Sequence, residues 1–105
     1  MSAAGPITHV VLIQWTRGTT DTDVERIRAI ARGLPARIPG ILDLVEGPSV
    51  SSEGLEQGLQ YGLVITFADA GSRDGYLPHP SHQVLVDELG RAAAHVAVFD
   101  VAGAQ

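Results

Sequence analysis

The sequence contains no cysteine and no lysine, and these two absences exclude several kinds of chemistry. Without cysteine there is no thiol nucleophile, thiolate metal site or disulfide. Without lysine no Schiff base can form with a carbonyl substrate, and all 7 basic side chains are arginines. Any catalysis therefore depends on histidine, tyrosine, acidic, hydroxyl and arginine side chains.

The chain is also poor in positive charge and has no long apolar run. Its 12 acidic and 7 basic side chains give a formal net charge of −5, and we expect no nucleic-acid partner because such binding needs a basic surface. No apolar run is long enough to cross a membrane, and no secretory signal precedes the first strand, so we expect a cytoplasmic protein. The length of 105 residues predicts one domain over residues 7–101, with a flexible N-terminus (1–6) and a C-terminal tail (102–105).

The hydrophobic pattern predicts the element order β-α-β-β-α-β. Strands are expected over 7–15, 41–46, 60–67 and 95–101, and helices over about 22–38 and 80–93. Residues 69–75 are expected to form a connection, with a short helical turn around Tyr76. Asp21 or Thr22 is expected to cap the first helix, with Glu25 completing a capping box. The order predicts a ferredoxin-like α+β sandwich, in which both helices cover one face of a four-stranded antiparallel sheet. The polar stretch 47–58 is long for so small a domain and predicts a lid or a partner-binding arm.

Residues 7–15 are apolar on both sides of the predicted strand, although the helices cover only one face of the sheet. An uncovered apolar sheet face is a binding surface, and a second copy of the chain would cover it symmetrically. We therefore expect a homodimer that packs sheet against sheet.

The segment Tyr76–His82 (YLPHPSH) concentrates titratable side chains in a stiff backbone. Pro80 suits the first position of a helix, and His79 before it is expected to be extended. His82 then falls in the first helical turn, where the helix dipole favours the neutral imidazole. A neutral imidazole can act as a general base.

The expected strand order brings further polar groups to this segment. The first and last strands are antiparallel neighbours, so His9 and Asp100 should lie close together, and Asp100 needs a partner because it stands in an apolar strand. The last strand runs antiparallel to the second helix that precedes it, so the start of this helix should lie beside Asp100. We expect His9, Tyr76, His82 and Asp100 to line one pocket.

Structural roles remain open for several of these residues. Asp100 can cap a loop or pair with an arginine, His9 can be a satisfied strand histidine, and His79 can be a scaffold residue before Pro80. His95 is expected at the surface or in a dimer interface. The His-x-x-His spacing of His79 and His82 is a weak metal signal, so we predict no metal site, although loose binding of a hard cation stays open.

The motifs resemble the stress-responsive A/B barrel (Dabb) family of the dimeric α+β barrel superfamily. The matching segments are HVVL (9–12), IPGI (38–41), Y-x-x-HP-x-H (76–82) and FD (99–100). The resemblance implies the ferredoxin-like fold and the homodimer. In the olivetolic acid cyclase branch, which closes linear polyketides by aldol condensation, the matching positions imply that His82 is the base and Tyr76 the orienting phenol. His9 and Asp100 match pocket positions, with Asp100 suited to hold the His82 imidazole.

The resemblance implies a cofactor-free lyase or cyclase with an apolar small-molecule ligand. Tyr61 replaces a histidine of the cyclase branch, and the loop 47–58 also differs. The expected substrate-binding residues are Val11, Ile13, Tyr61, His79, Leu85 and Val98. Two alternatives remain: a non-catalytic stress-responsive binding protein, and a monooxygenase of the superfamily type, cofactor-free or haem-linked.

Overall fold

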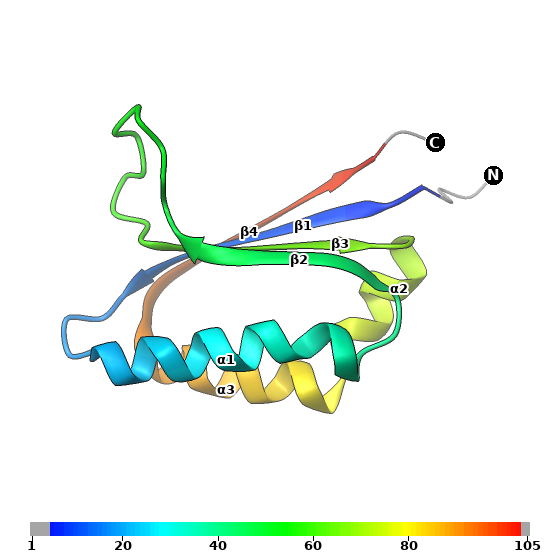
Figure 1. Cartoon of the computed structure of the whole chain (residues 1–105), viewed down its shortest axis with the longest axis horizontal. Coiled ribbons are helices and arrows are strands. Elements are labelled where there is room, and N and C mark those ends of the chain that lie inside the picture. Colours follow the sequence, from blue (N-terminus) through cyan, green and yellow to red (C-terminus); the bar gives the residue numbers. More distant parts are fainter. Residues whose placement is uncertain (1–4, 104–105) are drawn as a thin grey trace.

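The computed structural model describes residues 5–103, and these form a sheet with helices on one face (Figure 1). The strands are β1 (Ile7–Trp15), β2 (Ile41–Pro48), β3 (Tyr61–Phe67) and β4 (Ala93–Ala102). The helices are α1 (Asp21–Arg37), α2 (Ala70–Tyr76) and α3 (Pro80–Ala92). All strand pairings are antiparallel in the order β2-β3-β1-β4, which confirms the ferredoxin-like fold and the neighbouring first and last strands. No helix within 5–103 combines the length and hydropathy that crossing a membrane requires.

The two central strands alternate between a buried and a half-buried face, β3 throughout and β1 from Ile7 to Ile13. Every second residue of these stretches is buried under the helices, and Ile13, Leu63, Ile65 and Phe67 are among the most enclosed side chains. This period of two is what a strand imposes on its side chains. From α1, Ile27, Ala31, Leu34 and the capping residue Ile38 complete the core, as the helical spacing predicts.

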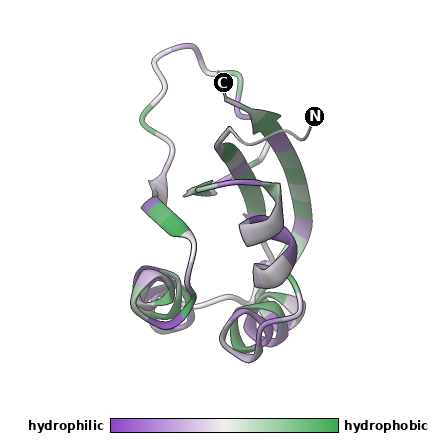
Figure 2. Cartoon of the chain, turned by 90° about the vertical axis from the view of Figure 1, so that its right-hand side faces the viewer, coloured by the Kyte–Doolittle hydropathy of each residue, from purple (hydrophilic) through white to green (hydrophobic). Residues whose placement is uncertain are grey.

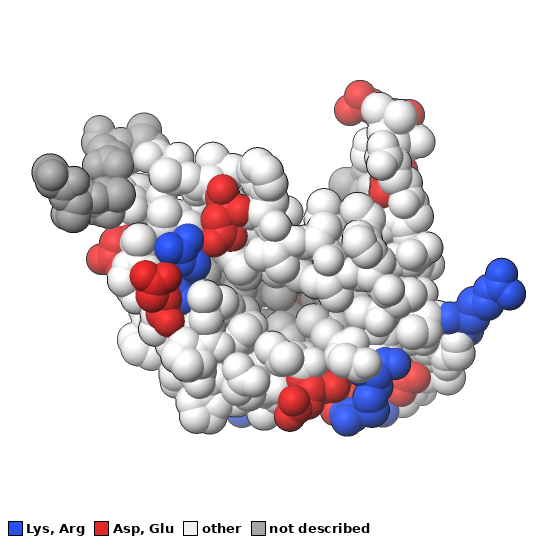
Figure 3. All heavy atoms as spheres, turned by 180° about the vertical axis from the view of Figure 1, so that it is seen from behind, with Lys and Arg blue, Asp and Glu red and all other residues white. Residues whose placement is uncertain are grey.

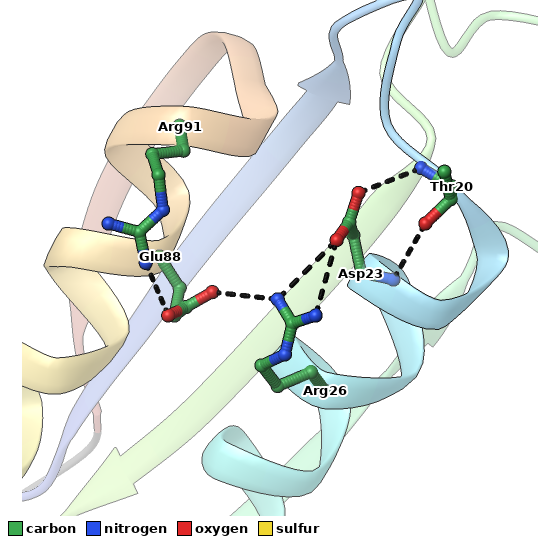
Figure 4. A network of polar contacts seen from close by, with 5 residues as sticks. All are labelled: Thr20, Asp23, Arg26, Glu88 and Arg91. Atoms are coloured by element: carbon green, nitrogen blue, oxygen red, sulfur yellow. Dashed lines mark hydrogen bonds and ion pairs between the residues drawn. The ribbon is translucent and has the colours of Figure 1, made fainter.

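The prediction for the start of α1 was wrong by about two residues. Thr20 is the N-cap: its hydroxyl accepts from the Asp23 backbone N–H at 3.1 Å, and the Asp23 carboxylate accepts from the Thr20 N–H at 3.0 Å. Asp23 therefore fills the capping-box position that was expected for Glu25, because Thr20 is the residue with the extended backbone of a cap. Asp23 also accepts from Arg26, which donates to Glu88 of α3 at 3.2 Å and so links the two long helices (Figure 4).

Three other boundaries differ from the prediction. Strand β2 continues through Gly47 and Pro48, which pair with β3, so the connecting arm comprises residues 49–60. A separate short helix, α2, precedes the tight turn at Leu77 and Pro78, where a single helical turn around Tyr76 was expected. Ala102 belongs to β4, because it pairs with Ile7. Residues 104 and 105 of the expected tail and residues 1–4 of the expected N-terminal segment lie outside the described residues.

The sheet face away from the helices is uncovered in the single chain. One row of side chains crosses all four strands of this face, as the registers Val45↔Val64, Val64↔Val10 and Val10↔Phe99 show. Phe99 is 70% exposed. The arm rises on this same side of the sheet (Figure 1), and its apolar residues Val50 and Leu55 are exposed. Strands rather than helices carry the most continuous hydrophobic colour (Figure 2).

Candidate functional site

A cavity of about 460 Å³ lies between the helix-covered face of the sheet and α3. Its walls are mainly apolar, and its titratable lining residues are His9, Tyr76, His82 and His95. The term cavity histidines denotes His9 and His82, whose rings lie against that of Tyr76. The apolar lining includes Val11, Leu63, Leu77, Leu85, Val86, Leu89, Val96 and Val98. Seen from behind, the molecule is hollowed between its layers, with uncharged residues around the hollow and charged side chains toward the margins (Figure 3). This is the volume and composition of a small-molecule site.

His9 reaches the cavity because it is an inward position of β1, opposite Asp100 of β4. Its imidazole is buried, and Nδ1–H donates to Asp100 Oδ1 at 2.6 Å. A carboxylate can only accept this bond, so the contact assigns the proton to Nδ1 and leaves Nε2 as the free ring nitrogen. The predicted pairing of His9 with Asp100 is confirmed.

Asp100 has a second cationic neighbour, Arg73 of α2. Arg73 NH1 donates to Asp100 Oδ2 at 2.9 Å, and Arg73 Nε donates to Asp74 at 2.9 Å. Burial raises the pKa of the Asp100 carboxyl, but the hydrogen bonds from His9 and Arg73 together outweigh burial and hold that pKa below its usual value. Asp100 is therefore a carboxylate at neutral pH.

Tyr76, the last residue of α2, lies between the two cavity histidines. Its ring centroid is 4.2 Å from that of His82 and 5.8 Å from that of His9. Burial raises the pKa of the phenol well above its usual range, so the hydroxyl stays protonated and can donate. Within residues 5–103 the hydroxyl has no hydrogen-bond partner that shifts this pKa. No side-chain nitrogen or oxygen atom there is both fully buried and without a partner, so the hydroxyl is accessible from the cavity.

His82 stands in the first turn of α3, as predicted from Pro80. Its Nδ1–H donates to the Leu77 carbonyl at 2.8 Å, which leaves Nε2 unprotonated in the neutral ring. Burial lowers the pKa of this imidazole below its usual 6.5, and the Leu77 bond offsets that shift only in part. His82 is thus held neutral near pH 7, with a free lone pair on Nε2.

The expected hydrogen bond between Asp100 and His82 is absent, and this part of the sequence prediction was wrong. Both carboxylate oxygens of Asp100 are occupied, by His9 and by Arg73. The tight turn after α2 instead presents the Leu77 carbonyl to His82. The imidazole is therefore oriented by backbone rather than by a carboxylate.

The expected substrate-binding residues separate into two groups. Val11, Leu85 and Val98 line the cavity with the histidines. Ile13 lies in the core, fully buried, and is not part of the cavity lining. His79 is the N-cap of α3: its extended backbone matches the prediction, and its Nδ1 accepts from the Ser81 N–H at 3.1 Å. It lines a different hollow, beside Pro39 and Gly40.

Tyr61 also points away from this cavity. Its hydroxyl donates to Glu46 at 3.0 Å, and the same carboxylate accepts from Arg28 at 2.8 Å and from Arg32 at 3.2 Å. Burial and the Glu46 bond raise the pKa of the Tyr61 phenol above its usual range. These contacts join β2 and β3 to α1, which is a structural arrangement.

The sequence did not indicate the roles of Leu77 and Arg73. Leu77 orients the His82 imidazole directly through its carbonyl, and Arg73 orients the His9 imidazole through Asp100. A backbone carbonyl leaves no signal in a residue pattern. Arg73 lies three positions before Tyr76, a helical spacing that places both on one side of α2, but the segment had been interpreted as a connection. Within 5–103, no group of three or more histidine and acidic side chains is arranged to hold a metal ion.

Comparison with solved structures places the fold among small α+β proteins. A hydroxynitrile lyase from Passiflora edulis is 14% identical, covering 97% of this chain and 96% of that one with a TM-score of 0.87. A dimeric ferredoxin-like protein of unknown function from Jannaschia sp. CCS1 is 25% identical, covering 94% and 100%, with a TM-score of 0.83. SnoaB, a cofactor-independent oxygenase from Streptomyces nogalater, is 15% identical, covering 97% and 96%, with a TM-score of 0.75. No curated protein matches the chain.

The fold is the ferredoxin-like α+β type, which the Jannaschia protein shares, and in this chain it carries a cavity under the sheet. More closely, the model of the stress-responsive A/B barrel (Dabb) domain matches residues 7–102. The chain therefore belongs to the Dabb family, as its motifs predicted.

Proposed function

We propose that the protein is a cofactor-independent enzyme that uses general acid–base catalysis on a carbonyl compound, closing a ring by an aldol-type reaction. The observation that carries the proposal is the Tyr76 phenol lying against the imidazoles of His82 and His9 in an apolar cavity. The free Nε2 atoms and the free hydroxyl supply an acceptor and a donor at one place. Exclusion of water strengthens each of these contacts.

A balanced reaction sequence follows from the His82 imidazole and the Tyr76 hydroxyl. His82 Nε2 takes a proton from the carbon next to a carbonyl, and the bonding pair becomes the enolate. The Tyr76 hydroxyl donates a hydrogen bond to the enolate oxygen. The enolate carbon then attacks a second carbonyl of the same molecule, and the resulting alkoxide takes the proton back from the His82 imidazolium. General base catalysis and oxyanion stabilisation are each typically worth about 10²-fold or more in rate.

The ligand is expected to be an apolar small molecule with carbonyl groups at one end. The titratable groups His9, Tyr76 and His82 stand at the start of α3, while Leu85, Val86 and Leu89 continue the wall along that helix. A linear polyketide analogue has this distribution of polarity. A thermal-shift and turnover screen with such analogues tests the function: the proposal expects stabilisation together with cyclised product.

The competing function is binding without catalysis, which the apolar cavity alone would support. In that case a ligand would stabilise the wild type and His82→Ala equally, and no product would form. Oxygen consumption with an aromatic substrate would instead favour the oxygenase chemistry of the SnoaB type.

The pH dependence of kcat/KM gives a further prediction. Protonated His82 cannot accept a proton, so activity is lost as the pH falls through its lowered pKa. The acid limb of the profile should therefore have its midpoint below 6.5. The unfolded chain binds more protons than the folded one in this range, so stability should also decline as the pH falls from 6.5. An acid limb centred above 6.5 would contradict the role of His82.

We also propose that two copies pack through their uncovered sheet faces. The proposal is supported by the exposed apolar row that ends in Phe99 and by the dimeric state of the Jannaschia protein. A two-fold axis parallel to the strands would set β4 of one copy over β2 and the arm of the other.

Phe99→Asp should convert the dimer to a monomer in sedimentation or light scattering at micromolar concentration, because it buries a charge in the proposed interface. The matched control is Val84→Asp, which places the same charge on an exposed valine of α3, away from the sheet face. A wild-type monomer, or a Phe99→Asp dimer, would contradict the proposed packing.

A further inference from the structure

Three residues from three different elements form one continuous hydrogen-bonded series that ends at the cavity. Arg73 of α2 donates to Asp100 Oδ2 at 2.9 Å, and His9 Nδ1 of β1 donates to Asp100 Oδ1 at 2.6 Å. We propose that Arg73 is a positioning residue which, through Asp100, holds the His9 imidazole with Nε2 available to the cavity as a second proton-transfer group. This inference rests on the proposed function, because the proton transfer belongs to the same carbonyl chemistry.

Helix α2 presents Arg73 and Tyr76 together. The two residues are three positions apart, so their side chains leave the helix on the same side. The N-cap Asp69 fixes the start of α2 by accepting from the Ser72 N–H at 2.7 Å. One short helix thus places both the phenol of the site and the cation that reaches Asp100.

Arg73 restrains Asp100 in both charge and orientation. Asp100 stands on the edge strand β4, between Val98 and Ala102 on the same face, so burial opposes its ionised form. The guanidinium bonds one carboxylate oxygen and leaves the other directed at His9. Asp74 holds the far side of the guanidinium through Nε at 2.9 Å. Without Arg73 the carboxylate loses the contact that fixes its rotation.

The two cavity histidines therefore have different partners on Nδ1. His82 donates to the neutral Leu77 carbonyl, and His9 donates to a carboxylate. A carboxylate in that position fixes the tautomer and stabilises the imidazolium that forms when Nε2 takes a proton. His9 is accordingly suited to carry a proton during turnover, while His82 is suited to begin in the neutral form.

The test is ¹⁵N NMR of the histidine side chains in the wild type, Arg73→Gln and Arg73→Lys. The wild type should show His9 in a single form with the proton on Nδ1. Arg73→Gln should give a mixture of tautomers and a raised Asp100 pKa by ¹³C NMR, and Arg73→Lys should restore both in part. The matched control is Arg91→Gln, which makes the same change at an exposed arginine of α3 that pairs with Glu88 and should leave the His9 and Asp100 signals unchanged.

Turnover provides the second readout. Loss of one charged hydrogen bond should lower kcat by about tenfold in Arg73→Gln, with KM little changed. The NMR result does not depend on any substrate, so an inactive wild type would refute the proposed function while the tautomer measurement still decides the role of Arg73. Unchanged His9 and Asp100 signals in a folded Arg73→Gln, or in Arg73→Ala if the glutamine variant does not fold, would overturn the inference.

Discussion

His82→Ala should lower kcat/KM for ring closure by about 10²- to 10⁴-fold, the usual contribution of a general base. The variant loses the free Nε2 lone pair that faces the cavity beside Tyr76. The fold should persist, because the imidazole makes one hydrogen bond to a carbonyl that also accepts from Gln83 at 3.1 Å. Steady-state kinetics together with a thermal melt measure both effects.

The matched control for this variant is Asp87→Ala on the same helix. Asp87 is exposed and is not among the lining residues of the cavity, so its replacement should leave kcat/KM within the error of the wild type. A cyclase whose turnover is unchanged by His82→Ala would require a different base and would contradict the assignment.

Tyr76→Phe should reduce kcat by about 10²- to 10³-fold, which is the effect of removing one donor to a developing oxyanion. The hydroxyl is the only group lost, and the ring keeps its contacts with Phe67 and with both histidines. Because this hydroxyl has no hydrogen-bond partner within 5–103, its removal should leave the melting temperature nearly unchanged. Kinetics and calorimetry of the same preparation separate the two effects.

Tyr61→Phe is the comparison variant and should behave in the opposite way. It deprives the buried Glu46 carboxylate of one donor, so it should lower the free energy of unfolding by about 1 kcal/mol while leaving kcat unchanged. Equal losses of activity in the two phenylalanine variants would mean that Tyr61 also serves the reaction.

Much of the fold follows from local patterns that the structure preserves. The β-branched runs 7–15 and 61–67 and the stripe from Ile27 to Ile38 depend on strand propensity and on the helix period, and both kinds of segment contribute to the buried core. The pairing of His9 with Asp100 was accessible because strand order determines register partners far apart in sequence.

The errors arose where a backbone group or a local competitor decides the geometry. The partner of His82 is the carbonyl of Leu77, which any residue type could supply. The N-cap of α1 is Thr20 and not Asp21 or Thr22, because its carboxylate partner in the capping box is Asp23 rather than Glu25. The hydrogen bond from Tyr61 to Glu46 was likewise not predicted, because Arg28 and Arg32 assemble a carboxylate site around Glu46. The expected contact of Tyr61 with a ligand stays a prediction.

The most direct test of the proposed base is exchange of a proton next to a carbonyl, which requires no knowledge of the natural substrate. An aryl methyl ketone incubated with the protein in D₂O can be followed by ¹H NMR as its methyl signal is replaced by deuterium. If His82 is the base, exchange should be faster than in buffer, should saturate with ketone, and should be lost in His82→Ala but retained in Asp87→Ala. Exchange at the buffer rate with wild-type protein, under conditions where the ketone is shown to bind, would contradict catalysis by this cavity.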